Sequence, residues 1–354
     1  MTIHATSLPN VPRTMRAAVY DRFGGPNVVR LTKIAVPRPG PSDVLIRVVA
    51  STVSAADHRM RARDLPPGIG LLAVPVVGMF RPHRRVLGMD FAGTVETVGA
   101  DVTIFAPGDE VVGMTGSAFG GHAEYLVLPE TAAIADRPAK LSHEDALALI
   151  FGGHTISECI RHRAIRFGDE VLVNGASGAV GSAAVQVAKH FGARVTAVTS
   201  ADNAEFLTRL GADRVIDYLT EDFAAGRETY DVVFDCVGNA PFDRVDRIIK
   251  PGGALLQVAA DFKALISAKG HTRRSGKLVT PITFTPAASD VAFATRLYRE
   301  GGLKPVIDRT YQFDEIVEAH RYVDTGHKRG SVVVQIAPSQ RQAAARTLTM
   351  VEVA

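Results

Sequence analysis

Residues 171–199 contain the feature that most constrains the fold: a strand followed by a glycine turn, a helix and a second strand. The apolar run Val171–Val173 leads into a turn with glycines at positions 175, 178 and 181. Apolar residues then recur at helical spacing until Gly192, and residues 194–199 have the composition of a strand. This order is typical of the βαβ unit of a doubly wound parallel sheet.

The glycine turn predicts a binding site for a dinucleotide cofactor. Glycine lets the backbone approach a pyrophosphate closely, and the N-terminus of the helix offers free N–H groups and a partial positive charge. The first position of the usual glycine spacing is Ala176, which fits a tight turn if its φ stays negative. The alternative is a βαβ unit that binds nothing. The expected cofactor contacts at the turn are Ala176, Ser177, Gly178, Ala179, Val180 and Gly181.

Length and composition indicate a globular protein of roughly two domains. Of 354 residues, 46% are hydrophobic and 22% charged, and the formal net charge of +3 comes from scattered basic residues. We therefore expect neither a nucleic-acid partner nor a membrane partner. The one basic cluster, residues 271–277, is expected to be a loop. Two distant cysteines, no signal-peptide pattern at the start and no apolar run of membrane length favour a cytoplasmic protein.

The pattern of the chain changes near residue 165. Short strand-like runs separated by turns fill residues 15–135, and Ser142 with Asp145 predicts the start of a helix. Strands and helices then alternate, which predicts an α/β protein with a doubly wound parallel sheet. We predict a β-rich domain in residues 1–146, a dinucleotide-binding domain in residues 147–286, and a return to the first domain with a C-terminal tail in residues 287–354.

The second half of the chain also carries less regular patterns. A helix is expected near residues 241–249, a turn at Pro251–Gly253 and a strand over 254–260. The alternating strand 331–336 fits a buried parallel sheet poorly, so we expect it to return to the first domain. The tail 340–354 is expected to form a loosely docked helix.

Several motifs outside the turn carry a family resemblance. They are Leu87–Gly93, Thr94–Gly99, Pro107–Val111, Ala123–Tyr125, Leu210–Asp213, Val215–Tyr218, Val306–Arg309, Ala319–His320 and Gly326–Val333. With Asn174–Gly181, they resemble the medium-chain dehydrogenase/reductase superfamily, and most closely its zinc-free quinone oxidoreductase-like branch. The resemblance extends from Met15 to Ile336. It implies a GroES-like β-rich catalytic domain, a Rossmann-like domain, an active cleft between them, and a homodimer.

The positions that hold catalytic zinc in the zinc alcohol dehydrogenases of this superfamily carry other residues here. The first ligand position is Ser54, the histidine position is Met89, and the third region, residues 151–154, has no cysteine. Hydroxyl and thioether groups are poor zinc ligands beside thiolate and imidazole. We therefore expect no metal.

The resemblance places three candidate catalytic residues, Ser54, Asp57 and His58, at the nicotinamide end of the cleft. His58 has the right ordinary pKa for a proton donor near neutral pH, but a surface histidine at a helix start is the alternative. We also count Met89 and His122 as candidate substrate contacts. Thr155 matches a family threonine near the nicotinamide, with a helix-capping threonine as the alternative.

The residues expected beside the ribose 2′ position do not clearly favour NADPH or NADH. The strand after the turn ends in Thr199 and Ser200, without the acidic residue typical of an NAD site, and Tyr218 matches a family tyrosine there. Asp202 stands where a basic residue is often found and would repel a 2′-phosphate. We therefore expect NADPH to be only slightly preferred over NADH.

Further cofactor contacts are expected where later parallel strands end, because ligands bind at the carboxyl ends of such strands. The C-terminal block adds two more by resemblance, although Ser331 stands where the family often has lysine. These residues are Cys236, Val237, Gly238, Val258, Ala259, Ala260, Arg329 and Gly330.

Three hypotheses for the function follow. The first is a zinc-independent NAD(P)H-dependent reductase that transfers hydride to a small electrophilic substrate, a quinone or an α,β-unsaturated carbonyl compound. The second is a dinucleotide-binding redox sensor or structural protein without catalysis. The third is a pathway-specific enoyl or carbonyl reductase for a larger substrate, with the apolar insert 65–86 lining its pocket or forming an oligomer contact.

Overall fold

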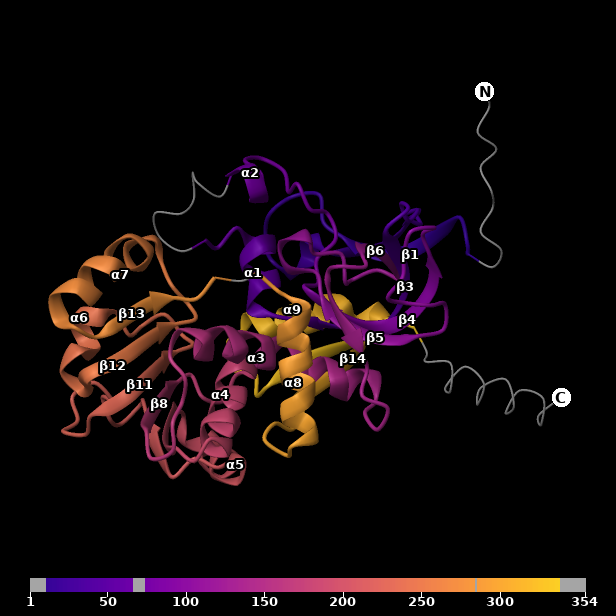
Figure 1. Ribbon diagram of the computed structural model, residues 1–354. Helices are drawn as coiled ribbons and strands as arrows, with labels where there is room; N and C mark the ends of the chain where they lie inside the picture. The colour runs from indigo at the N-terminus through magenta and orange to yellow at the C-terminus, as the bar shows by residue number, and fades with distance from the viewer. Residues whose placement is uncertain (1–10, 66–73, 284, 338–354) are drawn as a thin grey trace.

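A computed structural model of the chain describes residues 11–65, 74–283 and 285–337, and its strands form two large sheets (Figure 1). The first sheet is wholly parallel, with the order β10-β9-β8-β11-β12-β13. This is the doubly wound order of a Rossmann-like domain, and the chain reverses its winding direction between β8 and β11. The strands are β8 (Glu170–Asn174), β9 (Arg194–Thr199), β10 (Arg214–Asp217), β11 (Tyr230–Asp235), β12 (Ile249–Gln257) and β13 (Leu278–Pro281).

The second sheet is largely antiparallel, with the order β14-β15-β3-β4-β5-β7 and with β6 paired to β3. A separate hairpin joins β1 (Thr14–Val19) to β2 (Arg30–Ala35). The sheet strands are β3 (Asp43–Val53), β4 (Asp90–Val98), β5 (Glu110–Met114), β6 (Tyr125–Pro129), β7 (Ala133–Asp136), β14 (Ile307–Gln312) and β15 (Ser331–Gln335). The fold is therefore α/β, with a GroES-like sheet domain beside a Rossmann-like domain.

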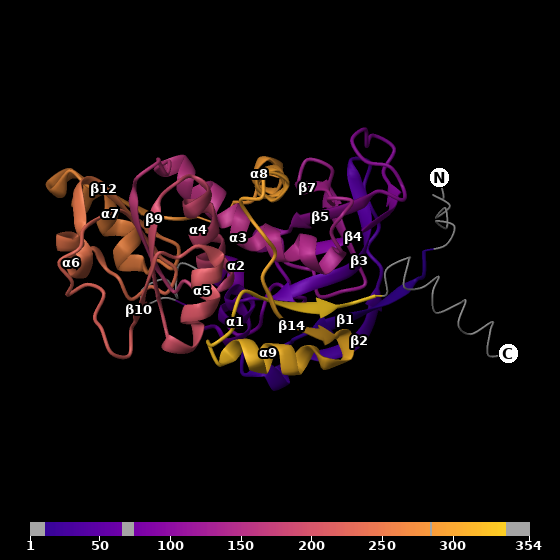
Figure 2. The same cartoon turned by 90° about the horizontal axis from the view of Figure 1, so that it is seen from below.

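The return of the C-terminal strand to the first domain is confirmed. Strand β15 pairs antiparallel with β3, with Val332 opposite Val53 and Val334 opposite Ser51. Figure 2 shows the two sheets side by side, with α3 (His143–His162) between them and α9 (Ile316–Asp324) along the antiparallel sheet. The remaining helices are α1 (Ala55–Ala62), α2 (Val74–Val77), α4 (Ala179–His190), α5 (Ala204–Leu210), α6 (Phe242–Val245), α7 (Phe262–Ser275) and α8 (Ala288–Arg299).

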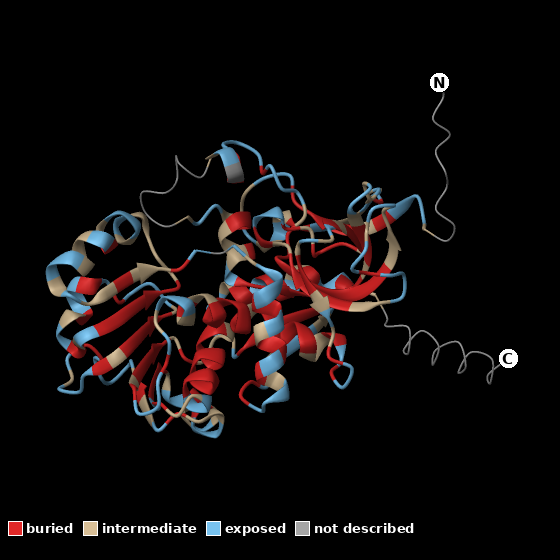
Figure 3. Cartoon of the chain, viewed as in Figure 1, coloured by how far each residue is buried: buried red, intermediate tan, exposed pale blue. Residues whose placement is uncertain are grey.

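Burial explains why the apolar runs form these elements. Figure 3 shows buried residues concentrated in the strands of both sheets and in α3 and α4. Val171, Leu172 and Val173 are wholly buried, as expected for a central parallel strand covered on both faces. The predicted start of α3 is also confirmed, because the Ser142 hydroxyl accepts a hydrogen bond from the Asp145 N–H at 3.0 Å.

The segment expected as a helix near residues 241–249 is helical over 242–248, as one turn of α-helix, α6, followed by a 3₁₀ turn, and β12 starts at Ile249. Two other predictions for the second half were wrong. The expected turn Pro251–Gly253 lies within β12, where the pairing with β11 is irregular and Gly252 has φ +72°. The basic cluster 271–277 is not a loop, because its first five residues form the last part of α7.

Two segments with sequence-based predictions, the insert 65–86 and the tail 340–354, lie partly or wholly outside the described residues. The insert 65–86 includes residues 66–73, which lie outside the described residues, and its short helix α2 begins at Val74. The tail 340–354 also lies outside them. In the described part of the chain, no helix is both long and apolar enough to cross a membrane.

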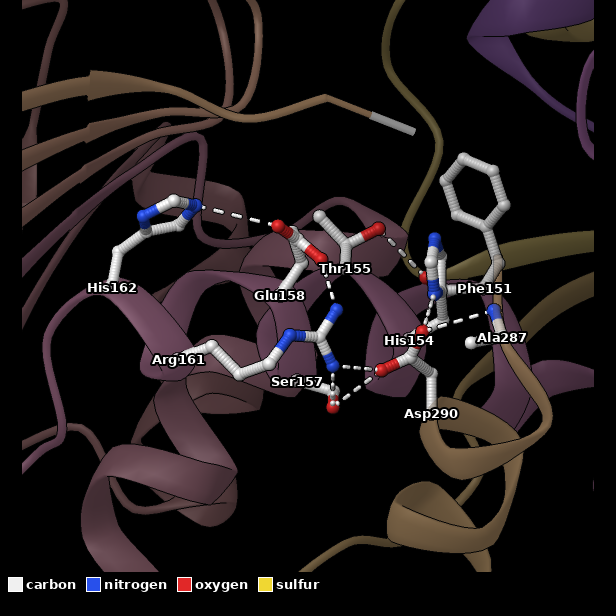
Figure 4. Close-up of polar contacts among 9 residues, drawn as sticks. All are labelled: Phe151, His154, Thr155, Ser157, Glu158, Arg161, His162, Ala287 and Asp290. Atoms are coloured by element: carbon white, nitrogen blue, oxygen red, sulfur yellow. Dashed lines mark hydrogen bonds and ion pairs between the residues drawn. The ribbon is translucent and has the colours of Figure 1, made fainter. Parts of the chain in front are cut away.

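A buried polar cluster fastens α3 to α8 (Figure 4). The Asp290 carboxylate accepts a hydrogen bond from the Ser157 hydroxyl at 2.8 Å, lies 3.2 Å from His154 Nδ1 and is paired with Arg161. Burial alone would raise the pKa of Asp290, but the hydrogen bonds from Arg161 and Ser157 hold it below its usual range. The cluster therefore holds a charged carboxylate in the core between the two helices.

The substitution Asp290→Ala should destabilise the protein by about 2–3 kcal/mol, because several buried donors lose a charged acceptor at once. Urea denaturation measures this loss. The matched control is Asp314→Ala, which removes an exposed carboxylate paired with Arg16 and should cost less than about 1 kcal/mol. Equal stability of the two variants would contradict the structural role of the cluster.

Candidate functional site

The glycine turn has the close backbone packing that its sequence predicts. A Cβ on Gly181 would lie 2.1 Å from the Gly175 carbonyl oxygen, so only glycine lets α4 pack this closely against the turn. Gly175 itself has φ +78°. Ala176 keeps a negative φ, and its N–H donates to the Val198 carbonyl at 3.1 Å. The alanine therefore fits the turn without strain.

Gly178 is the open position of the turn. It is the N-cap of α4 with φ −72°, and a Cβ there would have only the Gly175 carbonyl oxygen within 4 Å, at 3.7 Å. The first turn of α4 has no acidic residue. An open backbone at the start of a helix whose N–H groups lack intrahelical partners fits the diphosphate of a dinucleotide.

The ends of β8, β11 and β12 meet beside this turn. The Asp235 carboxylate accepts backbone N–H bonds from Val237 at 3.1 Å, Gly238 at 2.9 Å and Ala240 at 3.1 Å, and so shapes the loop after β11. Asn174 donates its amide to the same carboxylate at 2.9 Å. Both residues were missed by the sequence reasoning, although a polar residue at the carboxyl end of a buried strand was a usable signal.

The other expected contacts lie around this loop. The N–H groups of Val258 and Ala259 donate to the Asp235 carbonyl. Gly238, with φ +93°, lies against the Ala259 carbonyl, and Ala260 is the next residue after Ala259 in the chain. Burial raises the pKa of the Cys236 thiol well above its ordinary value. Cys236 therefore stays protonated and acts as a small packing group.

The residues expected beside the ribose 2′ position come together at the end of β9. The Asn203 amide donates to the Thr199 and Ser200 hydroxyls, each at 3.0 Å. Tyr218 is half exposed and donates its N–H to the Thr199 carbonyl at 3.1 Å. Asn203 was not among the predicted residues, and it orients both hydroxyls.

Arg329 reaches this group of residues from the distant C-terminal block. Its guanidinium donates to the Asp202 carbonyl at 3.2 Å, and its N–H donates to the Asp308 carboxylate at 2.8 Å. Its neighbour Gly330 donates an N–H to the Ser177 carbonyl at 2.8 Å. The structure therefore brings a cation to the backbone of Asp202, two residues after Ser200, where the local sequence offers only an acidic side chain.

Ser54 and Asp57 form a tight unit at the start of α1. One Asp57 oxygen accepts from the Ser54 N–H and the Ser54 hydroxyl, both at 2.7 Å, and the other accepts from the Gly88 N–H at 2.8 Å. Asp57 is wholly buried. The carboxylate thus fixes the Ser54 hydroxyl and the backbone at Gly88, and acts as a positioning residue.

His58 is engaged on both ring nitrogens. Nδ1 lies 2.7 Å from the Asp324 carboxylate and Nε2 lies 3.3 Å from Asp64. Asp324 also pairs with the wholly buried Arg61 at 2.6 Å, which links α1 to α9. The contacts of His58 are those of a residue that joins two helices.

The two candidate substrate contacts lie in the interior. Met89 is 7% exposed and packs in the apolar core. His122 is wholly buried, its Nε2 bonds to the Thr52 carbonyl at 2.8 Å, and its ring lies edge-on to His320 at 5.6 Å. A substrate contact of either residue stays a prediction.

Asp90 and Thr155 each have a hydrogen-bond partner inside the protein. The buried Asp90 carboxylate accepts from the Thr52 N–H and hydroxyl, and burial raises the pKa of Asp90 to about 7. Sequence reasoning did not select Asp90. The Thr155 hydroxyl donates to the Phe151 carbonyl at 2.9 Å within α3, so it does not cap the helix (Figure 4).

The side chains at the family's zinc positions do not fit a zinc ion. The Ser54 hydroxyl is bound to Asp57, the Met89 thioether lies in the core, and the His154 ring lies against Asp290. Serine and thioether ligands are unsuited to zinc in any case. Among the residues that the structure describes, no three His, Cys, Asp or Glu side chains are grouped to hold a metal ion.

Two substitutions in the turn should affect different properties: one lowers cofactor affinity and the other lowers the stability of the fold. In Gly178→Ala, the methyl group enters the open space, so we expect dinucleotide affinity to fall about tenfold with less than about 1 kcal/mol of lost stability. In Gly181→Ala, the methyl group meets a backbone oxygen, so we expect a loss of about 3 kcal/mol or more. Thermal unfolding and equilibrium binding measure both effects, and a Gly178→Ala variant with unchanged affinity would contradict this assignment.

Comparison with known proteins agrees with the geometry. The family model described as "Alcohol dehydrogenase GroES-like domain" matches residues 40–138, and the one described as "Zinc-binding dehydrogenase" matches residues 210–334. The chain is similar to 2-methylene-furan-3-one reductase of Solanum lycopersicum, at 32% identity over 93% of this chain and 81% of the relative. It is equally similar, at 32% identity, to NADPH-dependent alkenal/one oxidoreductase of Arabidopsis thaliana, covering 95% of this chain and 83% of that one.

A solved structure supports the same family. The quinone oxidoreductase from Coxiella burnetii superposes with a TM-score of 0.82 at 28% identity, covering 92% of this chain and all of that one. These relatives are named as reductases or oxidoreductases. The turn, the strand order and the returning strand are those that the family resemblance implies. The chain belongs to the medium-chain dehydrogenase/reductase superfamily, in its quinone oxidoreductase-like branch.

Proposed function

We propose that the protein is a zinc-independent, NADPH-dependent reductase of a small electrophilic substrate, a quinone or an α,β-unsaturated carbonyl compound. The observation that carries this proposal is the absence of suitable zinc ligands where Ser54 and Met89 stand. Without a Lewis acid to hold an alkoxide, the favoured substrate stabilises its own negative charge. The names of the alkenal/one and quinone oxidoreductase relatives support the same substrate class.

Dinucleotide binding is assigned to the glycine turn and the strand ends around it. When bound, a nicotinamide dinucleotide supplies a hydride, and a proton completes the two-electron reduction of the substrate. The backbone at Gly178 and the start of α4 hold the diphosphate, and the loop from Cys236 to Gly238 borders it. Ser54 and Thr155 are proposed to face the nicotinamide.

The proton is proposed to come from solvent. The Ser54 hydroxyl donates its own proton to Asp57, and His58 is held between two carboxylates. Neither side chain is poised to release a proton to a substrate in this arrangement. The protein's contribution is then to orient the reactants.

The preference for NADPH is proposed to depend on Arg329. The hydroxyls of Thr199 and Ser200 leave room for a 2′-phosphate, and Tyr218 flanks them. The Arg329 guanidinium, held at the Asp202 carbonyl, supplies a positive charge that offsets the Asp202 carboxylate. A homodimer and a cytoplasmic location remain predictions.

A substrate screen tests the proposed function. Protein treated with a chelator is mixed with NADPH or NADH and a panel of quinones, enones and 2-alkenals, and cofactor oxidation is followed by absorbance. We expect turnover that survives the chelator. Tight binding without turnover would instead support the redox-sensor hypothesis, and activity only on a larger enoyl or carbonyl substrate would support the pathway-specific one. A requirement for added zinc would contradict the proposal.

The substitution Arg329→Ala should raise the KM for NADPH about tenfold and leave the KM for NADH within about twofold, because only NADPH carries the 2′-phosphate. Steady-state kinetics with both cofactors measures the ratio. Arg321→Ala is the matched control, since this exposed arginine on α9 pairs with Glu318 and Asn27. Equal losses for the two cofactors would contradict the role given to Arg329.

A further inference from the structure

Lys328 lies in a loop that reaches the glycine turn. It was not among the residues predicted to contact the cofactor. It belongs to the loop between α9 and β15, and its ammonium donates to the Gly330 carbonyl at 2.7 Å. Gly330 in turn donates its N–H to the Ser177 carbonyl at 2.8 Å and is paired with Gly178 across a parallel bridge. The carbonyl that anchors the Lys328 ammonium therefore belongs to the residue that is paired with Gly178, at the open part of the turn.

The backbone at Gly330 holds this arrangement in place. Gly330 has φ +75°, and a Cβ there would lie 2.4 Å from the Val306 carbonyl oxygen. A side chain at this position is therefore excluded, and the loop stays against the turn. The lysine side chain folds back over this glycine.

Two carboxylates face the Lys328 ammonium, and both are already engaged. Asp308, on β14, accepts from the Tyr322 hydroxyl at 2.7 Å and from the Arg329 N–H at 2.8 Å. Asp90, on β4, accepts from Thr52. Within the described residues, no carboxylate forms an ion pair with Lys328, whose hydrogen-bond partner is a neutral carbonyl.

The environment leaves the ammonium poorly solvated. Burial lowers the pKa of Lys328 to about 8, against the opposing effect of the charges of Asp308 and Asp90. A partly buried cation without an ion-pair partner gains from an added anion.

The turn itself lacks a cation for a diphosphate. Residues 175–182 contain no lysine or arginine. The helix N-terminus supplies only a partial charge. A doubly charged diphosphate at Gly178 would therefore need a basic residue from elsewhere in the fold.

We propose that Lys328 binds the diphosphate of the dinucleotide. This inference rests on the proposed function and adds a division of roles. Lys328 serves the diphosphate, which NADPH and NADH share, and Arg329 serves the 2′-phosphate, which only NADPH carries. The two neighbouring cations thus set overall affinity and cofactor selectivity separately.

Equilibrium binding distinguishes these roles. The Kd values of NADPH and NADH are measured by nicotinamide fluorescence, and that of ADP-ribose, which has the diphosphate but no nicotinamide, by calorimetry. In Lys328→Gln, we expect all three Kd values to rise by a common factor of about ten or more, with the NADPH-to-NADH ratio unchanged. Lys328→Arg should retain most of the affinity. Lys33→Gln, at an exposed lysine on β2, is the control and should change nothing.

The pH dependence gives a second readout. Only the protonated ammonium attracts the diphosphate, and the bound anion raises its pKa. Affinity should therefore fall as the pH rises above about 8. Lys328→Arg should abolish this fall, because arginine stays protonated.

The outcomes separate the two proposals. Wild-type-like ADP-ribose binding by Lys328→Gln, or a loss confined to NADPH, would overturn the inference and leave the proposed function intact. A wild-type protein that binds neither dinucleotide would overturn the proposed function and the inference with it. A fall in affinity above about pH 8 that persists in Lys328→Arg would also overturn the inference.

Discussion

The backbone hydrogen bond from Gly330 to Ser177 joins the two halves of the molecule at the glycine turn. On one side, the chain continues from Gly330 into β15, whose register with β3 fixes the backbone leading to Ser54. On the other side, Ser177 precedes the helix that is suited to bind phosphate. One short loop therefore sets the relative positions of the proposed diphosphate site and the proposed reaction site.

This arrangement explains why a locally weak motif can form a complete site. The turn has no basic residue, and the 2′ region carries an aspartate. In our proposal, both deficits are met by consecutive residues, Lys328 and Arg329, from a segment more than 120 positions away in the sequence. The positive charge proposed to bind the cofactor phosphates comes from the tertiary fold. The local sequence of the turn and of the 2′ region alone therefore suggests weaker phosphate binding than the fold allows.

The parts predictable from sequence are those with strong local signals. The βαβ unit, the start of α3 and the return of β15 follow from glycine spacing, a capping pair and an alternating strand. Helix α7 was missed because Gly270 and a polar second half weaken its periodicity, even though Asp261 caps it by accepting from the Ala264 N–H. The β12 boundary failed because Pro251 and Gly252 are typical of turns, and here the bulged pairing with β11 accommodates them.

For the site, residue types were predictable but their roles were not. Asp57 was expected near the chemistry, and its three hydrogen bonds make it a positioning group. His58 was a candidate acid, and its partners Asp64 and Asp324 occupy both ring nitrogens. Such contacts join residues far apart in the chain, and no local pattern encodes them.

The central claim is that hydride passes directly from the bound cofactor to an electrophilic carbon without a metal. The most direct test uses chelator-treated protein, NADPH carrying deuterium on the transferred face of nicotinamide C4, and a 2-alkenal. The account predicts one deuterium at the β-carbon of the product, detected by NMR, and a solvent-derived proton at the α-carbon. A product without deuterium from the cofactor, or product formed only after zinc is restored, would contradict it.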